Sequence, residues 1–523
     1  MQEVLAFLKS VFAAILAFFM AIYGFFAGLF HCNKPDDTTT TTAIVSESDV
    51  SSTDITDISD ITDITDPSGD STETTDESST ESTTWPSTTE YSVNPTTQKD
   101  AVAKQSLISF GGSDIERFTG SSARSGNFWA CGITRSKNGK FSGLISGKFA
   151  SPYGFITKYN SDGEEIFTIP VYDSANPVYL TDIAVMRKGN AVVCGYIEKS
   201  SGIAAFFNVY DTDGNLLIHK VANCSGNTVY NAVAATSDGF VIGGQACSNT
   251  GDFEGLPDYT CGILMRFNTD GEILWKRYIG GSKGASVNDL DTDNSNNTYV
   301  TLSSASSDGE MASFDGLVEG SLDNVVIKYD YTGNLKWYKV LSSNGTDNFD
   351  SIAADSNYGG CVVGGSYTVY STENGGTLNG LTNVGGTDSV LFRYDSDGNE
   401  KWKRVISGVK DDFISDVVKL DGGYAAVGYS ESSNREFTNN YGGYDGFVDV
   451  ISITGKQIVC RNLGGSERDQ VATAAFNGTT LMAFGHSLST DCFFEGQNAN
   501  VTDAAVENLW YDCFMARYNV DLT

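Results

Sequence analysis

Histidine, proline and basic residues are scarce in this chain of 523 residues. It has only 3 His, so a metal centre built from several histidines is nearly excluded. Lys and Arg number 33 against 66 Asp and Glu, which gives a formal net charge of −33. Nucleic acid and anionic membrane surfaces both need a basic footprint on the protein, so neither is expected as a partner. The 8 Pro, beside 56 Gly and 12% aromatic residues, favour an all-β, turn-rich body over a helical one.

Motifs of metal binding are also missing, and the chain offers little for covalent catalysis. The sequence contains no C-x-x-C metal-ligand spacing, and its one G-x-S-x-G match, Gly280–Gly284, lies in a body expected to be all-β, where no strand-to-helix nucleophile elbow is expected. The two histidines of the body, His219 and His486, both fall on expected strands. Acidic residues are plentiful enough for a carboxylate pair of the glycosidase type. We therefore expect a protein that is not an enzyme and needs no cofactor. A hydrolase is the alternative.

One long apolar run stands near the N-terminus. Residues 11–30 carry no charge and are long enough to cross a bilayer as a helix. We therefore expect residues 1–32 to be a single-pass signal anchor. Two alternatives stay open: cleavage as a secretory signal, although no clear small-x-small site follows, and lipidation of Cys32, although His31 stands where a small residue is normally needed.

Residues 33–100 are rich in Thr, Ser and Asp. They hold 16 acidic and 2 basic residues, and the segment Asp54–Asp66 repeats every three residues as DITDISDITDITD. Trp85 and Tyr91 are the large aromatic residues of this segment. Such a composition cannot bury enough apolar surface to offset the entropy of ordering, so it predicts a disordered, self-repelling stalk.

The remaining residues, 101–523, repeat one pattern seven times: an alternating apolar–polar strand followed by an Asp- or Asn-rich turn. Six of these turns close with a glycine, namely Gly163, Gly214, Gly271, Gly333, Gly398 and Gly455. Four residues after each glycine stands an apolar anchor, namely Phe167, Ile218, Trp275, Trp337, Trp402 and Val459. The pattern predicts a strand, a hairpin turn and a second strand in every repeat.

A Gly-rich strand, such as AAVGYS from Ala425, also recurs seven times and completes a unit of four antiparallel strands. Units of this size and strand number are typical of β-propellers. The last repeat stops at its third strand, whereas the body begins with SLISFGG from Ser106, which matches the end of a fourth strand. We therefore predict an all-β, seven-bladed propeller over 101–523, in which the N-terminal strand completes the last blade and closes the ring.

A family resemblance accompanies this pattern. The repeat D-x-F-x-x-K-Y-D-x-D-G-N-x-x-W with the following G-G-S and D-G-G-Y elements resembles that of secreted and surface bacterial β-propellers, over about 101–523. The D-x-D-G-x-x-x-W line is also similar, more distantly, to the Asp-box of sialidases and the Trp-docking motif of quinoprotein-type propellers. The resemblance implies a propeller fold and brings no catalytic residue.

Long loops are expected on one face of the disc and tight turns on the other. Binding residues tend to lie on long loops held by a rigid scaffold, so we place any binding surface on the long-loop face. Blade 2 has only Glu198–Gly202 between its second and third strands, which predicts a notch there. A Phe-x-Gly element recurs in these loops, and we interpret each Phe as pinning its own loop; these are Phe141, Phe253, Phe314 and Phe494. Better ligand candidates are the less regular aromatics Tyr441, Tyr444, Trp510 and Tyr511.

Aspartates recur near the start of the first strand of several blades, close to the expected channel mouth. They are Asp182, Asp289, Asp350 and Asp416. They could line an anionic pocket for a cation or for sugar hydroxyls, and a hydrolase would use them as its carboxylates. Alternatively, each bonds local backbone where a loop becomes a strand, which is the reading that we favour.

Two further patterns invite a chemical interpretation. The turns Asp211–Asn215 and Asp395–Asn399 suggest a structural Ca²⁺, yet they run directly into strands and lack a distal Glu, so hairpin turns are expected. Cys247 and Cys261 flank one long loop, and Cys492 and Cys513 flank the corresponding loop of blade 7. This equivalence predicts two loop-closing disulfides outside the cell.

These observations together predict a membrane-anchored extracellular propeller. We expect it to act as a non-enzymatic binding or adhesion module for a protein or a polysaccharide. A carbohydrate-active enzyme using channel-mouth carboxylates and a structural scaffold of the cell envelope are the alternatives.

Overall fold

The computed structural model describes residues 102–522, apart from 258, 318–321, 344, 369–376, 379 and 497–510. The expected anchor and stalk, residues 1–100, lie outside the described residues, so both stay predictions. Within the described part, no helix has the length and apolar character needed to span a membrane.

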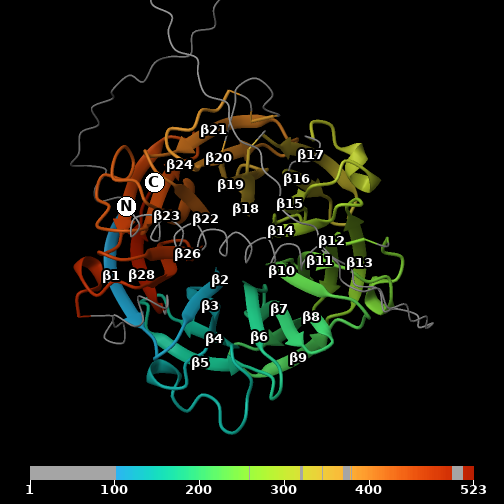
Figure 1. The fold of residues 1–523 in the computed structure, drawn as a ribbon, viewed down its shortest axis with the longest axis horizontal. Coiled ribbons are helices and arrows are strands. Elements are labelled where there is room, and N and C mark those ends of the chain that lie inside the picture. Colours follow the sequence, from blue (N-terminus) through green and yellow to red (C-terminus); the bar gives the residue numbers. More distant parts are fainter. Residues whose placement is uncertain are drawn as a thin grey trace, which may run out of the picture. The chain divides into compact units, whose positions relative to one another are not determined.

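The described strands form seven four-stranded antiparallel sheets that are arranged as blades around a central axis (Figure 1). The first strands of the blades lie nearest the axis: β2 (Glu116–Arg124), β6 (Val178–Val185), β10 (Thr228–Ala235), β14 (Ala285–Thr292), β18 (Asp347–Ala354), β22 (Asp412–Leu420) and β26 (Asp469–Phe476). The second strands are β3 (Asn127–Thr134), β7 (Ala191–Lys199), β11 (Gly239–Ala246), β15 (Thr298–Ser304), β19 (Cys361–Tyr367), β23 (Gly423–Ser430) and β27 (Thr480–Ser487). The predicted seven-bladed propeller is confirmed.

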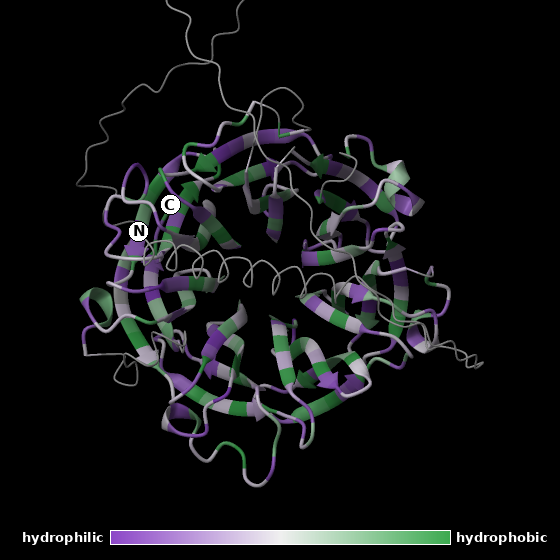
Figure 2. Cartoon of the chain, in the orientation of Figure 1, coloured by the Kyte–Doolittle hydropathy of each residue, from purple (hydrophilic) through white to green (hydrophobic). Residues whose placement is uncertain are grey.

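The third and fourth strands extend each blade outward. The third strands are β4 (Tyr153–Tyr159), β8 (Gly202–Tyr210), β12 (Cys261–Asn268), β16 (Asp323–Tyr329), β20 (Asp388–Tyr394), β24 (Asp445–Ser452) and β28 (Asp512–Val520). The outer strands are β5 (Glu165–Val171), β9 (Leu216–Val221), β13 (Ile273–Ile279), β17 (Leu335–Leu341), β21 (Glu400–Ile406), β25 (Gln457–Leu463) and β1 (Val102–Phe110). Hydrophobic and hydrophilic residues are mixed along the outer strands (Figure 2).

Ring closure follows the prediction from the sequence. Strand β1 pairs antiparallel with β28, from Val102 opposite Val520 to Phe110 opposite Cys513, and so supplies the fourth strand of blade 7. The two ends of the propeller are therefore joined by hydrogen bonds, and blade 7 is assembled from both ends of the chain. Blade 2 has the expected short connection, because β7 and β8 are separated by only Ser200 and Ser201.

Hydrophobic cores lie between blades, and the apolar anchors on the outer strands extend them. Trp337 of blade 4 packs on the turn of blade 5: its Nε1 donates to the carbonyl of Ser396 at 3.0 Å, and a methyl group built on Gly398 would lie 2.8 Å from its Cδ2. Gly398 has φ +83°, a conformation that favours glycine. The same contact of an anchor with the next blade's turn glycine, here called a dock, occurs in five pairs: Phe167–Gly214, Ile218–Gly271, Trp275–Gly333, Trp337–Gly398 and Trp402–Gly455.

Short 3₁₀ helices carry most of the Phe-x-Gly elements: η1 (Gly139–Phe141), η2 (Gly251–Phe253), η3 (Gly309–Ser313) and η4 (Cys492–Phe494). The phenylalanines are at most 6% exposed and lie in the inter-blade cores; they are Phe141, Phe253, Phe314 and Phe494. The interpretation that each Phe pins its own loop is confirmed.

Candidate functional site

A polar channel runs along the axis of the ring. Its cavity of about 670 Å³ is lined by the seven inner strands and by the turns at their ends. Each inner strand has a register shift at the same place, so seven positions are equivalent around the wall: Gly120, Asp182, Ala232, Asp289, Ser351, Asp416 and Thr473. Aspartates thus occupy blades 2, 4 and 6, and small residues occupy the other four blades.

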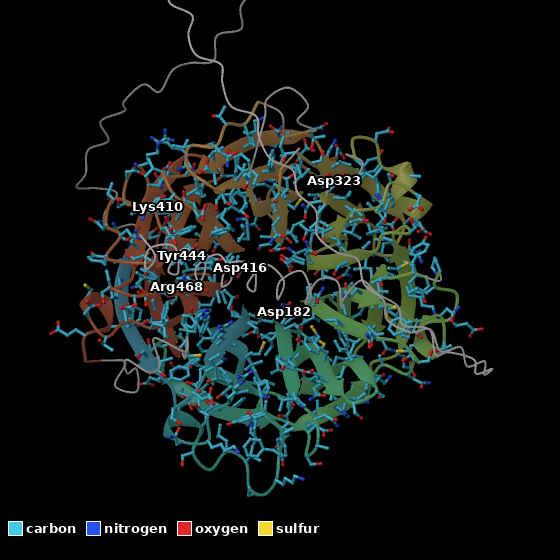
Figure 3. The ribbon with its side chains drawn as sticks, viewed as in Figure 1. Asp182, Asp323, Lys410, Asp416, Tyr444 and Arg468 are labelled. Atoms are coloured by element: carbon cyan, nitrogen blue, oxygen red, sulfur yellow. The ribbon has the colours of Figure 1, made fainter. Side chains whose placement is uncertain are left out.

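Three of the four expected channel aspartates join neighbouring blades. One carboxylate oxygen accepts the amide that follows in the same strand, and the other accepts an amide of the next blade. The bonds to the next blade are Asp182 to Val233 N (2.8 Å), Asp289 to Ile352 N (2.8 Å) and Asp416 to Ala474 N (2.9 Å). Asp182 and Asp416 lie near the centre of the ring (Figure 3). All three carboxylates thus bond backbone amides, one in their own strand and one in the next blade.

Small neighbours make room for these carboxylates. A methyl group built on Gly120 would lie 2.5 Å from Oδ1 of Asp182. Asp416 also accepts hydrogen bonds from the hydroxyls of Ser351 in blade 5 and Thr473 in blade 7, each at 3.0 Å. Because seven is odd, the alternation of aspartate and small residue fails once, between blades 7 and 1. There the hydroxyls of Ser121 and Thr473 bond each other at 2.8 Å.

Asp350 differs from the other three expected aspartates. Alignment of the inner strands places it at the bulge, and Ser351 stands where Asp416 stands in blade 6. Its carboxylate accepts a hydrogen bond from the Asn348 side chain, and the residue is exposed at the channel. Asp350 therefore joins no blades. It is the one exposed residue among the expected aspartates, although partial burial of its carboxyl group in the channel raises its pKa to about 6.

Burial raises the pKa of the wall carboxylates. For Asp182 the pKa rises to about 8, because burial and the nearby charges of Asp416 and Asp291 outweigh its amide hydrogen bonds. Asp291, which bonds the amide of Ala354 in blade 5 at 2.9 Å, has a pKa raised to about 6. The pKa of Asp289 is raised by the same causes. The raised pKa values favour the protonated carboxyl groups, which reduces the negative charge of the wall.

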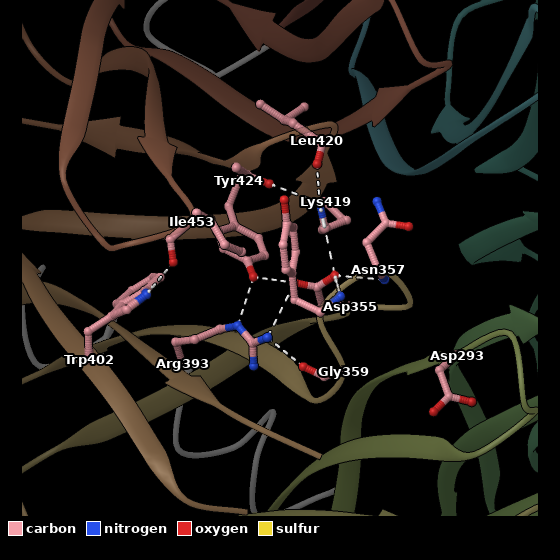
Figure 4. Close-up of polar contacts among 12 residues, drawn as sticks. Asp293, Asp355, Asn357, Gly359, Arg393, Trp402, Lys419, Leu420, Tyr424 and Ile453 are labelled. Carbon is pink, nitrogen blue, oxygen red and sulfur yellow. Dashed lines mark hydrogen bonds and ion pairs between the residues drawn. The ribbon is translucent and has the colours of Figure 1, made fainter. Parts of the chain in front are cut away.

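A buried network closes the wall between blades 5 and 6 near the tight-turn face (Figure 4). Asp355 is fully buried and accepts hydrogen bonds from the Tyr424 hydroxyl and, at 3.3 Å, from the Arg393 guanidinium. Lys419 on the inner strand lies 4.0 Å from the same carboxylate and donates to the carbonyl of Leu420. Its ammonium is thereby engaged, so this lysine serves inter-blade packing.

Aromatic side chains gather at the long-loop face of blade 6. Phe413 and its cross-strand partner Tyr429 stack with ring centroids 5.0 Å apart, and Tyr444 packs edge-on against Tyr429 at 5.3 Å. Arg468, from the loop that enters blade 7, lies with its guanidinium carbon 5.5 Å from the centre of the Tyr444 ring. We call Phe413, Tyr429 and Tyr444 the blade 6 aromatic cluster; its members are half-buried, and Arg468 is exposed.

The charge around the blade 6 aromatic cluster is mixed. Burial and the carboxylates of Glu431 and Asp411 raise the pKa of Tyr444 far above its usual range. Burial raises the pKa of Tyr429 to about 12, and the nearby Asp350 adds to this shift. Acidic groups thus lie near the rings, and the guanidinium of Arg468 lies over Tyr444.

The other expected aromatic candidates lie apart from this cluster. Tyr441 is 45% exposed and packs against Phe493, with ring centroids 5.6 Å apart. Tyr511 is only 4% exposed, because it packs edge-on against His486 with ring centroids 4.8 Å apart. The prediction that Tyr511 contacts a ligand directly is therefore wrong. Trp510 lies outside the described residues.

Sequence reasoning found Tyr444 but missed Phe413, Tyr429 and Arg468. A signal was available in the repeats. The pair equivalent to Phe413 and Tyr429 is polar in blade 5, Asn348 with Ser366, and aromatic again in blade 2, where Tyr179 and Tyr196 stack at 4.8 Å. Comparing this position blade by blade would have singled out blades 2 and 6.

The two expected disulfides are not formed. Cys261, Cys492 and Cys513 are free thiols. Ala246 lies opposite Cys261 in the β11–β12 ladder, so Cys247 is one residue out of register with its expected partner. Cys492 is exposed on η4, whereas Cys513 is buried in the core between blades 7 and 1. Flanking one loop did not bring either pair of sulfur atoms together.

The two turns considered for Ca²⁺ are hairpin turns, as expected. Asp211 Oδ1 accepts the amides of Asp213 and Asn215 at 2.9 and 2.8 Å, and Asp395 does the same in its own turn. In the described part of the chain, no group of three or more His, Cys, Asp or Glu side chains is arranged to hold a metal ion.

Comparison with known proteins says more about the fold of the chain than about its function. No family model matches the chain. The regulatory protein FlaEY of Caulobacter vibrioides is 24% identical over 172 residues, which is 32% of this chain and 18% of FlaEY. The chain thus matches less than a fifth of that relative's length.

Several solved structures are similar to the chain at low identity. The WD40 propeller domain of Doa1 is 10% identical with a TM-score of 0.42, over 80% of this chain and 98% of that one. A protein of unknown function from Dyadobacter fermentans is 10% identical with a TM-score of 0.41, over 80% and 100%. The acylaminoacyl peptidase of Pyrococcus horikoshii is 9% identical with a TM-score of 0.38, over 71% and 49%. Such distant likenesses carry no argument about what this chain binds.

Proposed function

We propose that this propeller is a non-enzymatic binding module that engages its partner on the long-loop face, at the blade 6 aromatic cluster and Arg468. The observation that carries the proposal is the half-buried ring cluster with a guanidinium over Tyr444, on the long-loop face near Asp350, which lines the mouth of the channel. Tyr and Arg side chains held in this way are enriched among the residues that dominate binding energy at protein interfaces.

The partner is a protein or a polysaccharide outside the cell, and the chain is anchored to the membrane by residues 11–30. Support for this location is the apolar run followed by an acidic, Thr-rich segment. Protein is the better match to the cluster, because an arginine and acidic groups both lie near the rings and can pair with charges on a polypeptide. A structural role in the cell envelope remains the alternative.

The hydrolase alternative loses most of its proposed carboxylates. A glycosidase needs two carboxyl groups free to act as acid and as base or nucleophile. Both oxygens of Asp182, Asp289 and Asp416 are occupied by amides that hold blades together. Asp350 alone, of the four, has the exposure that such chemistry needs.

The test uses the full chain on a panel of immobilised polysaccharides and on separated, surface-derived proteins. Wild type should bind at least one protein, and Tyr444→Ala should weaken that binding about tenfold. Tyr196→Ala, in the equivalent stacked pair of blade 2, is the matched control and should bind as wild type does. Binding confined to a polysaccharide would identify the other partner class, and binding that survives Tyr444→Ala would refute this site.

A further inference from the structure

Two buried aspartates meet where blade 6 joins blade 7. Asp445 begins β24 and Asp469 begins β26, and both are fully buried. The turn that enters blade 7 lies against both carboxyl groups. A methyl group built on Gly464 would lie 2.3 Å from Oδ1 of Asp445. The next residue, Gly465, donates its amide to Oδ2 of Asp469 at 2.7 Å. We call Asp445 and Asp469 the acid pair.

One oxygen of the acid pair has no hydrogen-bond donor. Both oxygens of Asp469 accept serine hydroxyls, from Ser487 at 2.5 Å and from Ser489 at 2.8 Å. Asp445 accepts the amide of Tyr441 through Oδ2 at 2.7 Å, but its buried Oδ1 has no hydrogen-bond partner in the described part of the chain. A buried acceptor without a donor is costly, and two neighbouring carboxylates repel each other when both are ionised. A proton held by the acid pair removes both costs.

The surroundings of the acid pair favour the protonated form. Burial raises the pKa of Asp445 and the pKa of Asp469 to about 7. The charges of Asp469 and of Asp491, which precedes η4, raise the pKa of Asp445 further, and Cys492 lies near both members of the pair. The pKa of Tyr444 lies far above this range, so the ring beside the pair stays neutral while the pair titrates.

The backbone connects the acid pair to the proposed binding residues. Tyr444 immediately precedes Asp445, and Arg468 immediately precedes Asp469. The amide of Asp469 donates to the carbonyl of Tyr444 at 2.6 Å, so a hydrogen bond joins the two blades at this point. The guanidinium carbon of Arg468 lies 5.5 Å from the centre of the Tyr444 ring (Figure 3). A separation of the two carboxyl groups therefore moves the ring and the guanidinium relative to each other.

The junction of blades 5 and 6 has the same arrangement. There Oδ1 of the buried Asp388 also has no hydrogen-bond partner among the described residues, and its neighbour Asp412 immediately precedes Phe413. Blade 2, which carries the equivalent aromatic pair, differs: Ala204 and Thr228 stand at the two places of the acid pair. Buried carboxyl pairs thus border the blade 6 aromatic cluster, and the junction of blades 2 and 3 has none.

We propose that the acid pair positions Tyr444 and Arg468 for the partner and makes the affinity of the blade 6 site depend on pH. While the pair holds a proton, its two carboxyl groups stay together, and the ring and the guanidinium keep their places. Loss of the proton leaves two like charges in a buried site, and their repulsion opens the junction and weakens binding. The inference rests on the proposed function and adds its regulation.

The test compares wild type with Asp445→Asn, as full chains, in their affinity for the protein that wild type binds. Asparagine supplies an N–H donor and cannot ionise, so it imitates the protonated pair. The partner's own groups titrate equally against both forms, so the ratio of the two affinities isolates the pair. We expect equal affinities at pH 6 and about fivefold tighter binding by Asp445→Asn at pH 8.5. Asp323→Asn, at the corresponding position of blade 4, is the matched control and should follow wild type.

Hydrogen exchange supplies a readout that needs no partner. After correction for the intrinsic exchange rate, the amide of Asp469 should lose protection between pH 6 and pH 8.5 in wild type and keep it in Asp445→Asn. Asp469→Asn is the second variant if Asp445→Asn does not fold. An affinity ratio, or a wild-type protection of this amide, that is the same at both pH values overturns the proposal. Unchanged binding by Tyr444→Ala at pH 6 would instead refute the proposed function, so the two failures are distinguishable.

Discussion

The polar groups of the channel wall are engaged by hydrogen bonds within the protein, whereas the side chains at the channel mouth are partly uncovered. In the wall, all the carboxylate oxygens of Asp182, Asp289 and Asp416 accept hydrogen bonds from backbone amides. Each carboxylate bonds one amide of its own blade and one amide of the next blade. At the mouth, the blade 6 aromatic cluster and Arg468 keep part of their surface uncovered. Groups that are satisfied internally hold the ring together, whereas groups left partly uncovered are available to a partner. Recurrence around an axis therefore indicates structure here, and departure from the repeat indicates function.

The largest effect should come from breaking the wall. Asp416→Ala removes the acceptor of two backbone amides and two hydroxyls that belong to three blades. Each buried donor left unsatisfied costs about 1–3 kcal/mol, so we expect a loss of at least ~3 kcal/mol in the free energy of unfolding. Chemical denaturation of the full chain measures it. The exposed Asp350→Ala is the control, expected within ~0.5 kcal/mol of wild type; equal losses in both variants would contradict the assignment.

A smaller and different effect should come from the mouth. Phe413→Ala removes the ring on which Tyr429 stacks, and we expect about tenfold weaker partner binding. Because the ring is half-buried, Tm should fall less than in Asp416→Ala. Asp182→Asn should show the reverse, with reduced stability and unchanged affinity. A binding loss in Asp182→Asn that equals the loss in Phe413→Ala would remove the distinction between wall and mouth.

The pH dependence of stability tests the buried carboxyl groups, including Asp182 of the wall. The folded-state pKa is raised to about 8 in Asp182 and Glu116 and to about 7 in Asp469, in each case chiefly by burial. Groups that bind protons more tightly when folded stabilise the protein fully below their unfolded pKa, near 4, and lose this contribution as pH rises through 7 to 8. Tm should therefore be a few degrees higher at pH 5 than at pH 8.5. Asp182→Asn should flatten that difference, and a Tm that rises with pH would contradict the shifts.

Asp350 gives the smallest expected effect and the sharpest test of catalysis. Its exposed carboxylate is the one that a channel-mouth hydrolase would still have. We expect no turnover of a polysaccharide panel by wild type and the same result for Asp350→Asn. Turnover by wild type that Asp350→Asn abolishes would establish the enzyme that the wall geometry disfavours.

The repeat pattern was sufficient to predict the blade number, the closing strand and the loop-pinning role of Phe253 and its equivalents, because each depends on order along the chain. It did not reveal that Asp182 reaches the amide of Val233, since that contact joins blades and depends on a bulge. Asp350 was grouped with the wall because it lies one residue from the equivalent position. The expected Cys492–Cys513 bond failed for a similar reason: loop spacing does not determine which way a side chain points.

The most direct measurement compares partner binding and unfolding in three forms of the full chain: wild type, a Phe413→Ala/Tyr444→Ala double variant and Asp182→Asn. On the protein that wild type binds, we predict that the double variant loses affinity at least tenfold while Asp182→Asn binds as wild type does and unfolds at lower denaturant. Retained affinity in the double variant, with binding lost in a folded Asp182→Asn protein, would contradict the claim that the mouth binds and the wall supports.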